Sequence, residues 1–115
     1  FISMGHINYL STLQFIDGII GNSSSGIAEA PTFKIGTVNV GDRQKGRLIA
    51  KSVINCEPTK KSIGSALNTL FSKEFQLSLH STINPYGDGN ATEKIMKKLI
   101  LSNFPVSTIK QFYDL

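Results

Sequence analysis

The sequence predicts an α/β fold in which a parallel sheet is flanked by helices. Three short runs of apolar and β-branched residues, 18–21, 36–40 and 52–56, indicate strands, and stretches with helical periodicity separate them. Strands that alternate with helices favour βαβ units, whose strands are parallel. The first two runs each lead into a loop bracketed by glycine. Open α/β sheets bind ligands at the carboxyl ends of their strands, so these are the candidate binding loops.

Apolar spacing and the residues that end each pattern predict the helices of the first half. A helix is expected over 6–16, where Asp17 and Gly18 end it. A shorter helix is expected over 25–33, ended near Pro31, because proline cannot continue the hydrogen-bonding pattern.

The second half contains two longer helical patterns. Thr59 is placed to cap a helix over 60–71, and residues 91–101 form an amphipathic helix. The expected buried face of the first of these is Ile63, Ala66, Leu67 and Leu70. Helical turns at 48–50 and 75–79, a turn cluster over 84–90 and a last short helix over 105–115 complete the prediction.

Composition limits the classes of protein to which the chain belongs. At 115 residues it forms one domain at most, with 40% apolar residues and a net charge of +4. The basic residues are scattered and no nucleic-acid-binding motif is present, so no nucleic-acid partner is expected. The single cysteine, Cys56, excludes an internal disulfide and fits a reducing compartment, so we expect a cytoplasmic location and a buried thiol at a strand end.

Other site classes find no support in the sequence. No apolar run approaches the ~20 residues that span a bilayer, and we expect no membrane partner. No residues have metal-ligand spacing, so we expect no metal and no cofactor. His6 and His80 are expected at the surface or at helix ends. The first residue is Phe1, and the chain has the character of a piece cut from a longer protein.

The first candidate loop carries three consecutive serines. Ser23, Ser24 and Ser25 precede Gly26 between a predicted strand and a predicted helix. A helix N-terminus offers free N–H groups and a positive dipole end, and serine hydroxyls donate to phosphate oxygens. Glu29 lies one turn into the helix, where its carboxylate could accept hydrogen bonds from ligand hydroxyls. The loop therefore favours an anion such as phosphate.

The second candidate loop, 41–47, is basic and follows the next strand. Because the strands are predicted to be parallel, the two loops should meet at one edge of the sheet. Arg43 is placed there to contact phosphate, whereas Lys45 and Arg47 are expected to be solvated or to face another domain.

Three motifs in this order closely resemble the UDP-N-acetylglucosamine 2-epimerases, above all the hydrolysing branch used in sialic-acid and capsular sugar synthesis. They are the runs Gly21 to Phe33, Thr37 to Arg47 and Asn84 to Ala91. The resemblance covers nearly the whole chain, from about Ser3 to Leu115. The non-hydrolysing branch is less similar, because its loop has Ser-Gly-Gly where Ser24-Ser25-Gly26 stands here.

The resemblance implies a fold of two Rossmann-like domains of the glycosyltransferase-B type, with the active site between them. Residues 1–115 would then be most of the C-terminal, UDP-binding domain, without the N-terminal one. It also implies that Ser23 and Ser24 bind the diphosphate, that Glu29 binds the ribose and that Arg43 binds near the phosphates. Tyr9 and Leu10 fall near the uracil.

The resemblance further implies a reaction. A base removes the proton at C2 of the sugar, UDP leaves by anti elimination, and water adds to the intermediate to give N-acetylmannosamine. The carboxylates for this chemistry lie mostly on the N-terminal domain, so no residue of this chain is assigned as catalytic. The chain alone is expected to bind UDP weakly and to be inactive, and the longer protein to be a homodimer or a higher oligomer.

Two other functions remain open. One is the nucleotide-sugar domain of a related glycosyltransferase or of a non-hydrolysing epimerase. The other is a nucleotide-binding or purely structural module without activity. The loop Gly41 to Arg47 favours an epimerase over a glycosyltransferase, and much of the sugar pocket would lie outside this chain, which leaves the identity of the sugar open.

Overall fold

A three-stranded parallel sheet forms the centre of the molecule. The structure is a computed structural model that describes residues 4–104. Its strands are β1 (Gly18–Gly21), β2 (Gly36–Val40) and β3 (Val53–Cys56), in the spatial order β1-β2-β3. Both neighbours pair parallel to β2, which is buried from its first residue to its fourth. The predicted parallel sheet is confirmed.

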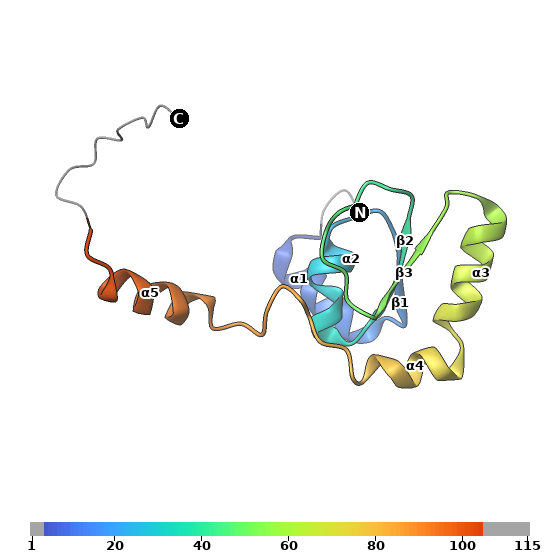
Figure 1. The fold of residues 1–115 in the computed structure, drawn as a ribbon. Coiled ribbons are helices and arrows are strands. Elements are labelled where there is room, and N and C mark those ends of the chain that lie inside the picture. Colours follow the sequence, from blue (N-terminus) through green and yellow to red (C-terminus); the bar gives the residue numbers. More distant parts are fainter. Residues whose placement is uncertain (1–3, 105–115) are drawn as a thin grey trace, which may run out of the picture.

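Helices cover both faces of this sheet, which gives three layers (Figure 1). On one face lie α1 (His6–Thr12) and α2 (Ser25–Ala28), and on the other lies α3 (Lys60–Leu70), followed by α4 (Lys73–Leu79). Each face has its own core. The first centres on Leu13, Ala30 and Ile35, and the second on Val38, Ala66 and Leu70. The central strand β2 is thus shielded from water on both sides, whereas Ile20 of β1 remains 53% exposed.

The first two helices end in tighter turns than their apolar patterns predict. The helix α1 passes into a 3₁₀ turn, η1 (Leu13–Phe15), and α2 is followed by η2 (Ala30–Phe33). Pro31 stands at the start of η2 and has no N–H with which to extend the α-helical ladder. Lys34 then adopts a left-handed conformation, with φ of 59°, and ends the helical segment before β2.

Side-chain caps fix the start of α3 and α4. Thr59 Oγ1 accepts a hydrogen bond from the Ser62 N–H at 3.2 Å, which confirms the predicted cap of α3. Ser72 Oγ does the same for the Phe75 N–H at 3.2 Å, so α4 begins at Lys73 and is longer than the predicted turn. Within the predicted buried face of α3, Ala66 and Leu70 are buried and the remaining two residues are half-buried.

The helical turn predicted at 48–50 is wrong. Residues 48–50 have no regular structure, and the whole connection from β2 to β3 is irregular. This connection must return the chain from the carboxyl end of β2 to the amino end of β3. A helix advances only about 1.5 Å per residue, against about 3.3 Å for extended chain, so a short connection spans the sheet best when it is extended.

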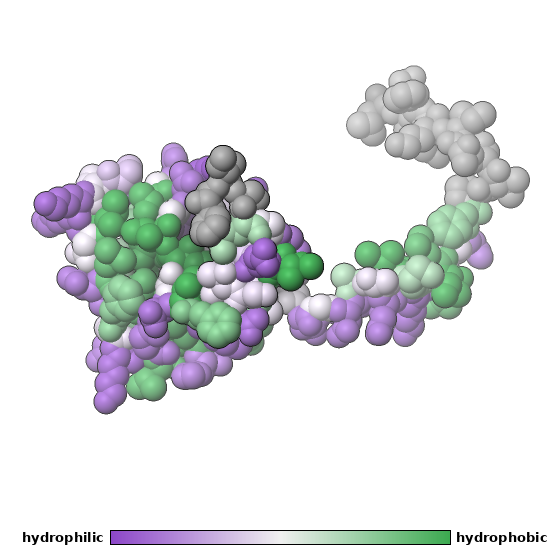
Figure 2. Space-filling view, turned by 180° about the vertical axis from the view of Figure 1, so that it is seen from behind, coloured by the Kyte–Doolittle hydropathy of each residue, from purple (hydrophilic) through white to green (hydrophobic). Residues whose placement is uncertain are grey.

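Helix α5 (Ala91–Leu101) has the predicted bounds but stands apart from the sheet and its helices (Figure 2). None of its residues is buried, and an apolar side faces away from a charged one. An ion pair between Lys94 Nζ and Asp88 Oδ1, 3.0 Å apart, joins its first turn to the preceding loop. The hydrogen bond that Lys94 donates lowers the pKa of Asp88. The last predicted helix, 105–115, lies outside the described residues.

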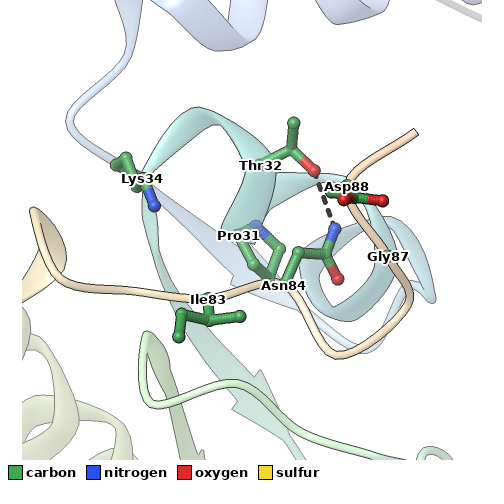
Figure 3. Close-up of a pocket in the computed structure, with 7 residues that line it drawn as sticks. All are labelled: Pro31, Thr32, Lys34, Ile83, Asn84, Gly87 and Asp88. Atoms are coloured by element: carbon green, nitrogen blue, oxygen red, sulfur yellow. Dashed lines mark hydrogen bonds between the residues drawn. The ribbon is translucent and has the colours of Figure 1, made fainter. Parts of the chain in front are cut away.

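Asn84 holds the segment before α5 against the body of the protein (Figure 3). Its Nδ2 donates to the Ala28 carbonyl oxygen at 2.8 Å and to Thr32 Oγ1 at 2.7 Å. Its Oδ1 accepts from the Tyr86 N–H at 2.9 Å, which closes the predicted turn. One side chain therefore ties α2 and η2 to a loop more than 50 residues away, since the sequence separations are 56 and 52.

The sheet and α3 approach each other closely where β1 and β2 have glycine. Gly18 and Gly36 are partners across the two strands. A Cβ atom at Gly18 would lie 2.7 Å from Leu70 Cδ2, and one at Gly36 would lie 2.4 Å from Leu70 Cδ1. Leu70 is 2% exposed and fills the space that the two absent side chains leave.

We expect Gly36→Ala to destabilise the chain by about 1–3 kcal/mol, because overpacking of a filled core has this cost. The matched control is Gly64→Ala in α3, where a Cβ atom meets nothing within 4 Å. It should stabilise the chain by up to about 1 kcal/mol, because alanine favours a helix over glycine. Urea unfolding measures both free energies, and destabilisation of similar size in both variants would contradict the packing argument.

Asn84→Asp keeps the acceptor for the Tyr86 N–H but removes the donor to Ala28 and Thr32. We expect a loss of about 1–3 kcal/mol in the free energy of unfolding, because a carboxylate then faces the Ala28 carbonyl oxygen without a proton to donate to it. Asn68→Asp, on the exposed side of α3, makes the same chemical change and should stay within about 0.5 kcal/mol of the parent. The argument fails if both variants unfold at the same urea concentration.

Candidate functional site

The two loops singled out in the sequence lie at the same edge of the sheet. Residues 22–24 follow the carboxyl end of β1, and the turn of residues 43–46 follows that of β2. A direct contact joins them, because Gln44 Nε2 donates to the backbone carbonyl oxygen of Asn22 at 2.7 Å. The structure therefore brings Arg43 to the same edge of the sheet as the three serines, as the sequence predicts.

The serine loop is partly exposed and partly fixed. Ser23 and Ser24 are exposed, and Ser23 Oγ accepts from the Ser25 N–H at 3.4 Å. Ser25 is half-buried, and its hydroxyl forms a hydrogen bond with the Tyr9 hydroxyl of α1. Two hydroxyls thus remain accessible at the edge of the sheet, while the third connects the loop to the neighbouring helix.

Gly26 lets α2 lie against the central strand. A Cβ atom there would be 2.5 Å from Thr37 Cγ2, and Thr37 Oγ1 donates to the Gly26 carbonyl oxygen at 2.9 Å. Gly26 is buried, so its contribution in this structure is close helix–sheet packing. A contact of Gly26 with a ligand stays a prediction.

Glu29 and Leu10 border the same region from the two helices. Glu29 is half-buried at the end of α2, and its N–H donates to the Ser25 carbonyl oxygen at 3.0 Å. Leu10 is half-buried and packs with Tyr9 against the core of Leu13, Ala30 and Ile35. The predicted roles of Glu29 at a ribose and of Leu10 at a uracil ring stay predictions.

The second loop presents exposed basic side chains. Arg43, Lys45 and Arg47 are all exposed, and within residues 4–104 none of them forms an ion pair. A hydrogen bond of 2.8 Å from the Lys45 N–H to the Asp42 carbonyl oxygen shapes the turn. Their cationic groups are therefore free to meet an anion at the edge of the sheet.

Side-chain amides next to this loop were missed in the sequence analysis. Gln44 is 3% exposed, and it helps to line a hollow of about 300 Å³ together with Asn39 and Asn55. Asn39 Nδ2 donates to Asn55 Oδ1 at 2.8 Å across neighbouring strands. The sequence held no signal for this burial, because a glutamine in a polar loop is ordinarily exposed.

A second hollow, of about 430 Å³, lies beside Asn84 and is drawn in Figure 3. Its other lining residues come from η2 and from the segment before α5: Pro31, Thr32, Lys34, Ile83, Gly87 and Asp88. Lys34 Nζ donates to the Thr82 carbonyl oxygen beside it. Gly87 and Gly89 have φ of 119° and 92°, as expected for their turn. This hollow is near the amino end of β2, away from the two candidate loops.

Several other expectations concern single residues. His6 and His80 are exposed, as predicted, and Cys56 is half-buried at the end of β3, less buried than predicted. Within residues 4–104, no group of three or more His, Cys, Asp or Glu side chains is arranged to hold a metal ion. The same part of the chain has no helix with the length and apolarity needed to cross a membrane.

Comparison with known proteins identifies relatives along the whole chain. The chain is 43% identical, over 117 aligned positions, to the GDP/UDP-N,N'-diacetylbacillosamine 2-epimerase (hydrolyzing) of Campylobacter jejuni, with all of this chain and 30% of that protein covered. It is 38% identical to polysialic acid biosynthesis protein P7 of Escherichia coli, with 99% of this chain and 29% of that protein covered. It is 31% identical to the UDP-N-acetylglucosamine 2-epimerase of Neisseria meningitidis, with 93% and 28% covered.

The chain thus spans about three-tenths of the length of the curated relatives it matches. The family model for UDP-N-acetylglucosamine 2-epimerase matches residues 1–100. That range contains the serine loop, the Arg43 loop and the turn closed by Asn84. The chain belongs to the UDP-N-acetylglucosamine 2-epimerase family.

Proposed function

We propose that this chain is the UDP-binding part of a hydrolysing 2-epimerase acting on a UDP-linked 2-acetamido sugar. The observation that carries the proposal is the junction of the serine loop and the Arg43 loop at one edge of a parallel sheet, in a chain of this family. Relatives from two species carry the word hydrolyzing in their names, which favours that branch. Their sugar is diacetylbacillosamine, so the sugar of this protein is proposed only as a 2-acetamido sugar.

The residues of the edge suit the parts of UDP. The exposed hydroxyls of Ser23 and Ser24 would donate to diphosphate oxygens, and the Arg43 guanidinium would add charge-assisted hydrogen bonds. Glu29 would accept from the ribose hydroxyls. Leu10, with Tyr9, offers apolar surface to the uracil ring. We extend the proposal to Ser25 and Gly26 as supports that hold the loop in place, since both already have partners within the protein.

In the proposed reaction UDP leaves as the C2 proton is removed, and water then adds to the sugar. Negative charge grows on the diphosphate as the bond to the sugar breaks. Donors fixed at that position stabilise the transition state more than the ground state. Arg43 and the serine hydroxyls would therefore contribute to rate as well as to affinity, while proton removal falls to groups outside this chain.

Arg43→Gln, made in the full-length protein that contains this chain, should raise the Kd for UDP about tenfold. The reason is the loss of a hydrogen bond between charged groups, about 1.5 kcal/mol. Arg47→Gln is the matched control, because it removes the same charge from the same exposed loop. Isothermal titration with UDP measures both, and equal weakening in the two variants would show that only the general charge of the loop matters.

The 115-residue chain alone should bind UDP with a Kd of about 1 mM, roughly 4 kcal/mol, and should release no UDP from UDP-N-acetylglucosamine. The contacts would be open to water on one side, which weakens each of them. An NMR titration with UDP measures the affinity, and an assay for released UDP measures the activity. Micromolar affinity or turnover by the purified chain would contradict this expectation, and the full-length protein is the positive control.

A further inference from the structure

Gln44 is buried in a loop whose other polar side chains are exposed. Its side chain is 3% exposed, whereas Arg43 before it and Lys45 after it are both exposed. A long polar side chain is seldom buried to this degree unless its position is fixed by partners. The loop therefore turns this one side chain inward, toward the serine loop.

The two ends of the Gln44 amide have different surroundings. Nε2 donates to the Asn22 carbonyl oxygen at 2.7 Å, whereas Oε1 is buried and has no hydrogen-bond partner within the described residues. A buried acceptor without a partner costs stability, because it has lost its water and gained nothing in exchange. Asn22 is exposed, so water could satisfy its carbonyl if the amide were absent. The Gln44 side chain therefore contributes little net stability at this position.

The same bond has a marked effect on geometry. Gln44 is next to Arg43 in the sequence, and Asn22 is next to Ser23. The hydrogen bond between Gln44 and Asn22 therefore ties the backbone next to Arg43 to the backbone next to Ser23. The turn is itself short and closed, with an N–H to carbonyl bond of 2.8 Å from Lys45 to Asp42. Movement at Gln44 is thus passed directly to Arg43.

We propose that Gln44 is a positioning residue that holds the loop carrying Arg43 beside the Ser23 and Ser24 hydroxyls, so that both loops can reach one diphosphate. The inference rests on the proposed UDP site and assigns a role to a residue outside it. Donors that converge on one anion lose much of their effect when one of them is displaced by about 1 Å. The bond from Nε2 acts on the geometry of the loops, whereas the unpaired Oε1 limits what the side chain adds to stability.

Gln44→Met tests the role, because methionine has nearly the same length and lacks both amide atoms. Gln76→Met is the matched control, since Gln76 Nε2 also donates to a backbone carbonyl oxygen, that of Leu70, at 2.7 Å, far from the loops. In the full-length protein, Gln44→Met should raise the Kd for UDP about tenfold and change the Tm by less than about 3 °C. Gln76→Met should leave the Kd within twofold.

A double-mutant cycle separates positioning from general destabilisation. If Gln44 acts through Arg43, then adding Gln44→Met to Arg43→Gln should cause no further loss, and the double variant should stay about tenfold weaker than the parent. A loss of about a hundredfold would show that the two residues act independently and would overturn the proposal. So would an unchanged Kd in Gln44→Met.

Hydrogen exchange of the protein without UDP tests the contact between the loops by itself. Amide exchange at residues 22–25 should be faster in Gln44→Met than in the parent or in Gln76→Met, and unchanged exchange would overturn the proposal. A parent protein that does not bind UDP would overturn the proposed function instead. In that case the exchange comparison still decides whether Gln44 holds the two loops together.

Discussion

The position of β2 between two parallel partners is the constraint on which the rest of the structure depends. Its backbone is hydrogen-bonded to β1 on one side and to β3 on the other, and both faces are covered by helices. Parallel pairing sends the chain out of β1 and β2 at the same edge, so the serine loop and the Arg43 loop leave the sheet side by side. At the other end, glycine in β1 and β2 allows α3 to approach.

Side-chain hydrogen bonds between distant segments hold the loops of this protein in place. Gln44 joins the two candidate loops, Thr37 joins α2 to the sheet, and Asn84 joins the last turn to α2 and η2. The one ion pair within residues 4–104, between Lys94 and Asp88, is exposed. Salt weakens exposed ion pairs but has little effect on amide and hydroxyl contacts. The cationic groups at the edge thus have no ion-pair partner within the described residues, which leaves them available for the proposed diphosphate.

The sequence predicted the elements whose signals are local. Thr59 caps α3 where expected, the three strands were located correctly, and α5 has its predicted bounds. Proline and glycine near their ends made these boundaries clear.

The features that the sequence did not predict depend on distant contacts. The extended path over 48–50 follows from the distance that the chain must cover between β2 and β3. The burial of Gln44 depends on Asn22, which is 22 residues away, and composition or periodicity carries no sign of it. The proposed contacts of Ser23, Ser24 and Arg43 with phosphate draw on the loop pattern as well as on the family resemblance, because a serine-rich loop alone also serves as an ordinary helix cap. The proposed contact of Glu29 with a ribose draws on the resemblance.

The close approach at Gly18, Gly36 and Leu70 has a consequence for how this domain diversifies. The Leu70 side chain occupies the space into which a Cβ atom at Gly18 or Gly36 would project, so the residues at these three positions do not vary independently. A larger residue at Gly18 is tolerated only with a smaller one at position 70, and one at Gly36 also meets Phe75 Cε1 at 2.9 Å. A smaller residue at 70 leaves a cavity unless a strand side chain fills it. Among sequences that descend from this one, a substitution at position 18 or 36 should therefore occur together with a substitution at position 70. The size of the side chain at position 70 then limits the residues that the two strands can accept.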